Sequence, residues 1–303
     1  MMGPKVPVEI MISVERIHSF LRKTPEQKWI TARFFVTMWL SKLPYAPHRV
    51  HLRLSSREHM AVWWSYFPAS FNPERSLLEY WGNDIGDLRF LWTHLQPGMT
   101  FLDIGAYHGL YSIVAAKKMG RVGRVVAFEP SARERDRMRL HLRCNKIDCV
   151  TVEPYALAAQ EGQAPLAVVV DGYSTMNSLR APVDHAAKQV IVNTISLDTY
   201  LIQNRIDNVD FLKIDTEGGE VEAFRGAHAL LGHIRPLIIC EVLDQVTRPW
   251  GYAAAEIMSL LRTYEYEWFD ILFDGRVIPH VPHNDYWEGR NYLAVPREKQ
   301  DLY

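Results

Sequence analysis

Acidic side chains follow two short apolar stretches in the middle of the sequence, at the point where each stretch ends. The segment FLDIGAYHGLYS, residues 101–112, carries Asp103, Gly105 and Gly109, and Glu129 follows the apolar RVVAF. A strand that breaks at a glycine and restarts as a helix is a typical place for a nucleotide-like cofactor. An acid at the end of the second strand can accept hydrogen bonds from both hydroxyls of a ribose. We therefore expect a ribose-containing cofactor here.

The turn after the first strand distinguishes between cofactors. A dinucleotide pyrophosphate requires a glycine-rich turn of free N–H groups, whereas this turn has a G-x-x-x-G spacing with the bulky Tyr107 and His108 inside it. The carboxylate of Asp103 would repel a phosphate and attract an ammonium group. The turn therefore indicates S-adenosylmethionine, which has a cationic sulfonium and an α-amino group.

A second acidic segment, FLKIDTEGGE at residues 211–220, has side chains that could act on a methyl acceptor. Lys213 and Asp215 lie on one face because side chains alternate along a strand, and a buried lysine needs a carboxylate partner. Methyl transfer to a hydroxyl requires in-line geometry, and a base that removes the hydroxyl proton accelerates it by about 10²–10⁴-fold. We predict that Asp215 or Glu217 is this base, with Lys213 in the same catalytic group.

A metal ion is the alternative for these carboxylates. Glu241 ends the next strand, so Asp215, Glu217 and Glu241 could together hold Mg²⁺, because hard cations prefer oxygen ligands. Base catalysis without a metal is the preferred interpretation. Glu241 is otherwise a candidate substrate contact, together with Tyr173 and Arg180 from a polar loop.

Strands and helices alternate along the part of the chain that must position these groups. Apolar stretches typical of buried strands lie at residues 100–104, 124–129, 150–157, 209–215, 236–242, 266–273 and 291–295, with helices expected at 110–119, 131–145, 196–203, 219–231 and 254–263. Two extra strands are expected at 166–170 and 190–195. Buried strands joined by helices predict a doubly wound α/β domain with a mostly parallel sheet. Ligands bind such sheets beyond the carboxyl ends of the strands.

Five segments together resemble a known family. FLDIGAYHG, VVAFEP, YALA, FLKIDTEGGE and PLIICEV, in this order, are similar to the motifs of the FkbM family of class I S-adenosylmethionine-dependent methyltransferases, and the closing NYLAVPRE is similar to the C-terminus of that family. The resemblance covers about residues 97–297. It implies a Rossmann-like, seven-stranded, mostly parallel sheet whose last strand is antiparallel. It also implies O-methylation of a hydroxyl on a sugar, polyketide or other small molecule.

The resemblance also implies roles for individual residues. Asp103 and Gly105 would line the methionine end of the cofactor, and Glu129 would bind the ribose. Pro130 and Ala156 would lie near the adenine.

The rest of the first turn is expected to line the cofactor as well. It comprises Ala106, Tyr107 and Gly109. The family usually has asparagine where this chain has Tyr107, and we expect the backbone at this position to line the cofactor all the same.

Length and composition limit the remaining classes. The chain has 303 residues, 48% of them hydrophobic and 23% charged, which suits one large domain with extensions. A net charge of −1 gives no argument for nucleic-acid binding. Three cysteines without a C-x-x-C pair suit a reducing cytoplasm. We predict an N-terminal extension over residues 1–96, the methyltransferase domain over 97–297 and a tail over 298–303.

The N-terminal extension is basic. Residues 1–60 contain ten lysines and arginines against four acids. Residues 9–42 are typical of amphipathic helices, which could pack on the main domain or make a weak contact with a membrane surface. The apolar FFVTMWL at 34–40 is far shorter than the roughly 20 residues of a membrane-spanning helix. A hairpin is expected at 49–64 and a helix at 74–95.

The sequence as a whole predicts a cytoplasmic S-adenosylmethionine-dependent O-methyltransferase whose acceptor is a small molecule or a saccharide. One alternative is an NAD-dependent oxidoreductase, which would need the phosphate-binding turn that the sequence does not have. The other is a non-catalytic protein that binds S-adenosylmethionine, or a membrane-peripheral scaffold that keeps the fold.

Overall fold

A computed structural model describes most of the chain beyond residue 83. The described residues are Lys28, the backbone of 49–53 and 59–63, and residues 84–170, 174–182, 185–288 and 290–302. The chain divides into two compact units, Met1–Ala46 and Pro47–Tyr303, and the second contains the sheets and helices described below residue by residue. Apart from Lys28, the helices expected at 9–42 lie outside the described residues, as do the start of the helix expected at 74–95 and Tyr173. The domain boundary at residue 96 stays a prediction.

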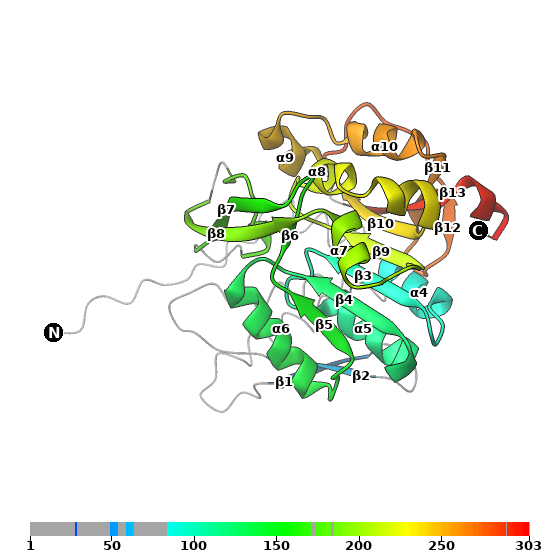
Figure 1. Cartoon of the computed structure of the whole chain (residues 1–303). Coiled ribbons are helices and arrows are strands. Elements are labelled where there is room, and N and C mark those ends of the chain that lie inside the picture. Colours follow the sequence, from blue (N-terminus) through cyan, green and yellow to red (C-terminus); the bar gives the residue numbers. More distant parts are fainter. Residues whose placement is uncertain are drawn as a thin grey trace. The chain divides into compact units, whose positions relative to one another are not determined.

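An eight-stranded sheet forms the centre of the fold (Figure 1). Its strand order is β12-β11-β13-β10-β9-β3-β4-β5. Five neighbouring strands run parallel, from β5 to β10, and β13 is antiparallel to both β10 and β11. The bounds are β3 Thr100–Ile104, β4 Arg124–Phe128, β5 Val150–Glu153, β9 Phe211–Ile214, β10 Leu237–Val242, β11 Tyr266–Ile271, β12 Val277–Pro279 and β13 Arg290–Pro296.

This arrangement confirms the predicted fold class, with one difference in strand number. The seven expected strands are present, and the last of them along the chain is antiparallel as expected. The eighth strand, β12, is a three-residue edge strand that pairs with β11 after a tight turn at Gly275. So short a strand has no periodicity of its own and forms only because β11 offers it an unpaired edge.

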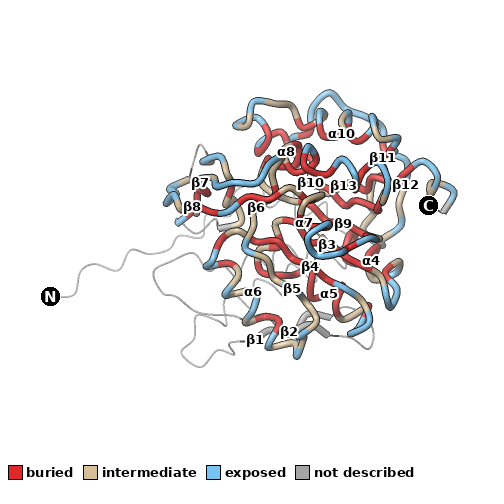
Figure 2. The backbone as a smooth tube through the Cα atoms, in the orientation of Figure 1, coloured by how far each residue is buried: buried red, intermediate tan, exposed pale blue. Residues whose placement is uncertain are grey.

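Helices cover both faces of the sheet. Figure 1 places α4, α5 and α6 along one face and α7, α8 and α10 along the other. Their bounds are α4 Ile85–His94, α5 Leu110–Met119, α6 Ala132–Cys144, α7 Leu197–Gln203, α8 Glu220–Arg225, α9 Asp244–Thr247 and α10 Ala255–Arg262. Tyr200, Phe224 and Ile257 from the second group pack with the sheet residues Ile104 and Ile214 in one buried cluster. Burial is therefore concentrated in the strands and in the helix faces that touch them (Figure 2).

A small separate sheet extends the region between β5 and α7. It has the order β6-β8-β7, with β6 Ala156–Leu157, β7 Gly162–Val169 and β8 Ala187–Ile195. We call β7, β8 and the residues between them the arm. The two strands expected at 166–170 and 190–195 are both present and longer than expected, and the stretch 150–157 is divided between β5 and β6 around Pro154. Proline lacks the N–H that a continuous strand would donate at this point.

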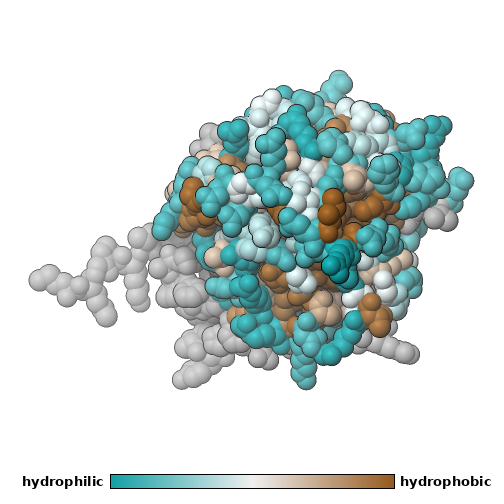
Figure 3. Space-filling view, viewed as in Figure 1, coloured by the Kyte–Doolittle hydropathy of each residue, from teal (hydrophilic) through white to brown (hydrophobic). Residues whose placement is uncertain are grey.

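The expected hairpin at 49–64 is present as β1 Arg49–Arg53 and β2 His59–Trp63, which pair antiparallel. On the face shown in Figure 3, hydrophilic residues predominate, and hydrophobic ones gather in small separate groups. Across the described residues, we find no helix with the length and apolarity needed to cross a membrane.

Candidate active site

A pocket lies at the carboxyl edge of the sheet, where β3, β4 and β9 end. Its empty volume is about 1030 Å³, which includes open solvent at its mouth. We call it the main pocket. The predicted site residues that line it are Asp103, Gly105, Ala106, Tyr107, Glu129, Pro130, Ala156, Lys213, Asp215 and Glu217.

Three other predicted residues do not line the main pocket. Gly109 precedes α5 as its N-cap in the left-handed conformation, with φ 83°, and a Cβ there would lie 2.8 Å from Met138. Its glycine is therefore explained by the packing of α6 and not by a ligand. Glu241 lies on β10, and Arg180 lines a neighbouring pocket.

Position 105 requires a glycine because the residues that follow β3 and β9 lie very close together. Its φ is +74°, and a Cβ would lie 1.8 Å from the carbonyl oxygen of Asp215. The N–H groups of Gly105 and Ala106 both donate to the carbonyl of Phe128, each at 3.0 Å. The first turn is thus fixed by backbone from β4 and β9, which brings the residues after three strands into one pocket.

Among the described residues, one carboxylate oxygen of Asp103 has hydrogen-bond donors and the other has none. Its Oδ2 accepts hydrogen bonds from the N–H of Ser112 at 2.9 Å and from its hydroxyl at 2.5 Å. Its Oδ1 is buried and has no partner within the described part of the chain. Burial raises the pKa of Asp103, while the charge of Lys213 and the bonds from Ser112 oppose that rise. A buried carboxylate oxygen without a donor is the feature that a ligand ammonium group would complement.

Glu129 ties together the turns that follow β3 and β4. Its carboxylate accepts from the N–H of Tyr107 at 2.9 Å and from the N–H of Ser131 at 2.8 Å. Burial raises its pKa to about 8, and the negative charge of Glu134 adds to the rise. The carboxylate retains acceptor capacity on both oxygens, so the position suits a ligand that donates two hydroxyl hydrogen bonds.

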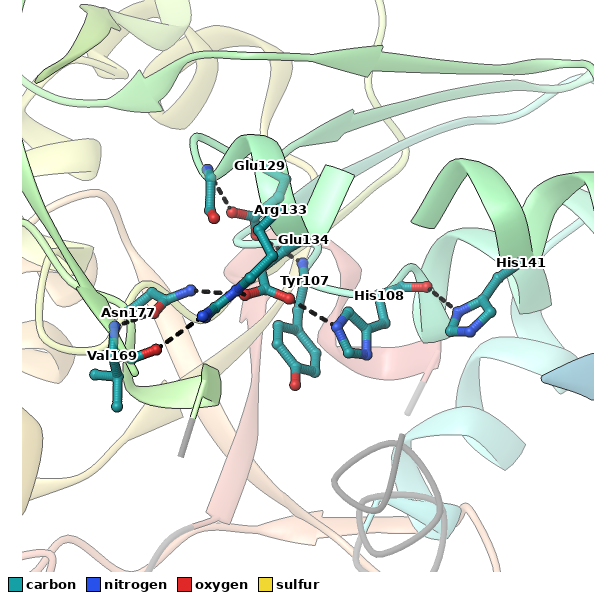
Figure 4. A network of polar contacts seen from close by, with 9 residues as sticks. Tyr107, His108, Glu129, Arg133, Glu134, His141, Val169 and Asn177 are labelled. Carbon is teal, nitrogen blue, oxygen red and sulfur yellow. Dashed lines mark hydrogen bonds and ion pairs between the residues drawn. The ribbon is translucent and has the colours of Figure 1, made fainter. Parts of the chain in front are cut away.

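Sequence reasoning missed Glu134, which lies at the centre of a buried polar network (Figure 4). It bonds to His108 Nε2 at 2.8 Å, Arg133 Nε at 2.6 Å and Asn177 Nδ2 at 3.3 Å. Asn177 also accepts from the N–H of Val169 at 2.8 Å. One carboxylate on α6 thereby connects the first turn to the arm.

The helical periodicity of the sequence could have identified Glu134 as a buried residue of α6. Met138 and Leu142 follow it on the same buried face of α6, at intervals of four residues. Glu134 is buried, whereas the arginines of this helix are exposed or half-buried. Its pKa is lowered despite burial, because His108 donates to it and Arg133 is charged.

The pairing predicted for Lys213 is confirmed. Lys213 is buried, and its Nζ donates to Asp215 Oδ2 at 2.8 Å. The ammonium also lies 4.9 Å from the ring centroid of Tyr111. Burial lowers the pKa of Lys213, but the charges of Asp215 and Asp103 outweigh it and raise the pKa above its usual value. Lys213 therefore stays cationic.

Glu217 differs from Asp215 in its surroundings. Its backbone is left-handed, with φ 54°, and its carbonyl accepts from Ser178 Oγ at 2.8 Å and Trp250 Nε1 at 3.1 Å. Its carboxylate has no hydrogen-bond partner among the residues described by the structure. Burial and the neighbouring acids Asp215 and Glu220 raise the pKa of Glu217 well above its usual value.

The metal alternative requires a third carboxylate close to Asp215 and Glu217. Glu241 pairs with Asn291 across β10 and β13 and lines neither this pocket nor its neighbour. Over the described ranges, which omit 171–173, 183–184 and most residues before 84, no three His, Cys, Asp or Glu side chains are arranged to hold a metal ion. The charges of Asp215 and Glu217 nevertheless contribute to a raised pKa of Glu241, and the choice between a base and a metal ion stays a prediction.

The fold and pocket define a class I methyltransferase: parallel strands end at one pocket, an acid follows the second strand, and one late strand is antiparallel. Residues 103–268, more than half of the chain, match the family model for the methyltransferase FkbM domain. The chain belongs to the FkbM family of class I S-adenosylmethionine-dependent methyltransferases, as the sequence motifs predicted.

Solved structures of other methyltransferases are similar to the chain at low identity. A methyltransferase FkbM from Methylobacillus flagellatus KT shares 17% identity at a TM-score of 0.42, over 66% of this chain and 44% of that chain. The chain thus spans less than half the length of that protein. An O-methyltransferase from Bacillus cereus in complex with SAH shares 13% identity at a TM-score of 0.41, over 93% and 96% of the two chains. No curated protein matches the sequence.

Replacement of Gly105 by alanine should strongly destabilise the protein. The left-handed conformation costs a non-glycine residue about 1–2 kcal/mol, and the new methyl group would also overlap the Asp215 carbonyl. We expect a loss of at least about 3 kcal/mol in the free energy of unfolding, measured by urea denaturation. Gly98→Ala is the matched control, because Gly98 has φ +89° but open space around it. Equal losses in the two variants would contradict the overlap.

Glu129 should make the cofactor-free protein less stable as pH rises. Its pKa is about 8 in the folded protein against a usual value of 4.5, so the folded state holds a proton that the unfolded state releases. The stabilisation is complete below about pH 4.5 and is lost as pH rises to about 8. We expect Glu129→Gln to remove this loss, which is on the order of a few kcal/mol.

The measurement is urea unfolding of both proteins at intervals between pH 4.5 and 8.5. Glu161→Gln, which removes an exposed carboxylate, controls for the change in net charge. If the free energies of unfolding of the wild type and Glu129→Gln change in parallel with pH across this range, the raised pKa of Glu129 is contradicted.

Proposed function

We propose that the protein is an O-methyltransferase that transfers a methyl group from S-adenosylmethionine to a hydroxyl of a small molecule or saccharide. The observation that carries the proposal is the pairing of two features in one pocket. Asp103 and Glu129 offer acceptor oxygens suited to an ammonium group and a ribose, and Glu217 offers a carboxylate that no described residue pairs with. Family membership supports methyl transfer, and these residues support a hydroxyl acceptor.

The cofactor would be held by the residues that line the first two strand ends. Asp103 Oδ1 would accept from the α-amino group, and Glu129 from the ribose hydroxyls. Pro130, Ala156 and Leu157 supply an apolar wall beside them for an adenine ring. Bound S-adenosylmethionine would supply an electrophilic methyl group on its sulfonium.

Glu217 is the better candidate for the base. Asp215 is held in an ion pair with Lys213, which occupies one of its carboxylate oxygens. Glu217 has no such partner in the described chain, and its pKa is raised toward the range in which a carboxylate accepts a proton effectively. Glu217 would take the hydroxyl proton as the acceptor oxygen reacts. Asp215 would keep Lys213 in place.

Calorimetric titration with S-adenosylhomocysteine tests the cofactor part of the proposal. We expect wild-type protein to bind it and Glu129→Ala to lose at least tenfold in affinity, about 1.4 kcal/mol, because the ribose loses its acceptor. Glu161→Ala, which replaces an exposed acid outside the pocket, should bind as the wild type does. Wild-type protein that does not bind S-adenosylhomocysteine would refute the proposal.

Glu217→Gln tests the base. The amide keeps the shape of the side chain and removes its ability to take a proton, so kcat should fall by about 10²–10⁴-fold while S-adenosylhomocysteine affinity stays within about threefold. Glu222→Gln on α8, whose native side chain pairs with Arg225 outside the pocket, is the matched control. The assay is transfer of a labelled methyl group to pooled hydroxylated acceptors. Unchanged turnover in Glu217→Gln would remove it as the base, and cofactor binding without turnover in wild type would favour the scaffold alternative.

A further inference from the structure

A second pocket adjoins the main pocket on the side of the arm. It is lined by Arg180, His185 and Met176 from the arm and by Gln245, Pro249 and Trp250 from the α9 region. We call it the side pocket. Ser178, Glu217 and Trp250 line both pockets, so these residues form the boundary between them. A ligand in the side pocket would therefore meet Glu217, the proposed base, at its inner end.

The boundary is fixed by hydrogen bonds to one carbonyl. Ser178 from the arm and Trp250 from the segment after α9 both donate to the backbone oxygen of Glu217, at 2.8 and 3.1 Å. Gly218 leaves room for the Trp250 ring, because a Cβ there would lie 2.5 Å from it. The indole is thus a fixed wall, and the base and both sides of the pocket are held in one arrangement.

Arg180 brings a positive charge to this pocket. Its guanidinium carbon lies 5.6 Å from the centroid of the Trp250 ring, which holds the group over the indole. No carboxylate of the described chain pairs with it. The arginine nearest in sequence to Trp250, Arg248, is already neutralised by Asp244 at 2.8 Å. Arg180 is therefore available for a ligand, and its planar fork suits a carboxylate or a phosphate.

The signs of charge differ between the two pockets. The main pocket is rich in acids, with Asp84, Asp103, Glu129, Asp215 and Glu217 on its wall. Among the lining residues that the structure describes, Glu217 is the one acid of the side pocket, and it stands at the boundary. An anionic group would therefore be attracted by Arg180, because the cation that lines the main pocket, Lys213, is already paired with Asp215.

We infer that the methyl acceptor carries an anionic group, a carboxylate or a phosphate, which Arg180 binds in the side pocket while a hydroxyl of the same molecule reaches Glu217. The inference rests on the proposed function and narrows its acceptor class. Trp250 acts as the support of Arg180, and Arg180 determines which acceptors bind.

The test uses full-length protein saturated with S-adenosylhomocysteine, whose binding is measured first by calorimetry. Ligand-observed NMR titrations then compare D-glucuronate, D-glucose 6-phosphate and neutral D-glucose, each at two ionic strengths. We expect at least one anionic sugar to bind tenfold or more tightly than glucose, with a preference that weakens at high salt. Binding of glucuronate alone would assign a carboxylate, and binding of glucose 6-phosphate alone a phosphate.

Arg180→Gln should abolish the preference for the anionic sugar, and Arg180→Lys should retain part of it, because the charge remains and the fork is lost. Arg143→Gln removes an exposed arginine of α6 that lines neither pocket and should leave the preference intact.

Equal binding of glucose and both anionic sugars, no binding of any of them to the saturated protein, or a preference that survives Arg180→Gln would overturn the inference. These outcomes leave S-adenosylhomocysteine binding in place, so they differ from failure of the proposed function, in which the wild-type protein would not bind S-adenosylhomocysteine at all.

Discussion

One buried ammonium group, that of Lys213, is the counter-charge on which the acidic site depends. Burial raises the pKa values of Asp84, Asp103, Glu217 and Glu241, and in each case the charge of Lys213 opposes the rise. Without a cation at this point, several carboxylates would share a region of low dielectric constant and would take up protons instead. The ion pair with Asp215 holds the cation at the strand end. Lys213 is thus the buried counter-charge of these carboxylates.

A second buried charge arrangement links the arm to the strand ends. Glu134 joins His108 in the first turn and Asn177 in the arm, and the next arm residue, Ser178, donates to the carbonyl of Glu217. Asn177 and Ser178, which are adjacent in the arm, therefore hold the arm to α6 and to the segment after β9. The buried bonds of Glu134 favour this arrangement of the arm, because its displacement would leave the Glu134 carboxylate and the Asn177 amide with fewer partners. The arm is in this way part of the site, although its strands belong to a separate sheet.

Sequence reasoning succeeded where strand order and alternation decide the outcome. Parallel strands end at one edge, so Asp103, Glu129 and Asp215 could be placed together from their positions alone, and alternation placed Lys213 beside Asp215. It failed where contacts are distant in sequence. The need for glycine at position 105 comes from a carbonyl 110 residues away, and the partners of Glu134 come from a turn and an arm that no local pattern relates to α6. The short β6 and β12 likewise form only because a longer strand offers them an edge.

The backbone at the pocket explains why a tyrosine can stand where the family usually has asparagine. Tyr107 has φ 48° and Glu217 has φ 54°, and both are left-handed residues on the pocket wall. Asparagine tolerates this conformation, whereas other side chains lose about 1–2 kcal/mol. At Tyr107 the loss is opposed by the bond from its N–H to Glu129 and by the stacking of its ring on His108, with centroids 3.6 Å apart. At Glu217 it is opposed by the two donors to its carbonyl. The surroundings thus impose the left-handed conformation at both positions.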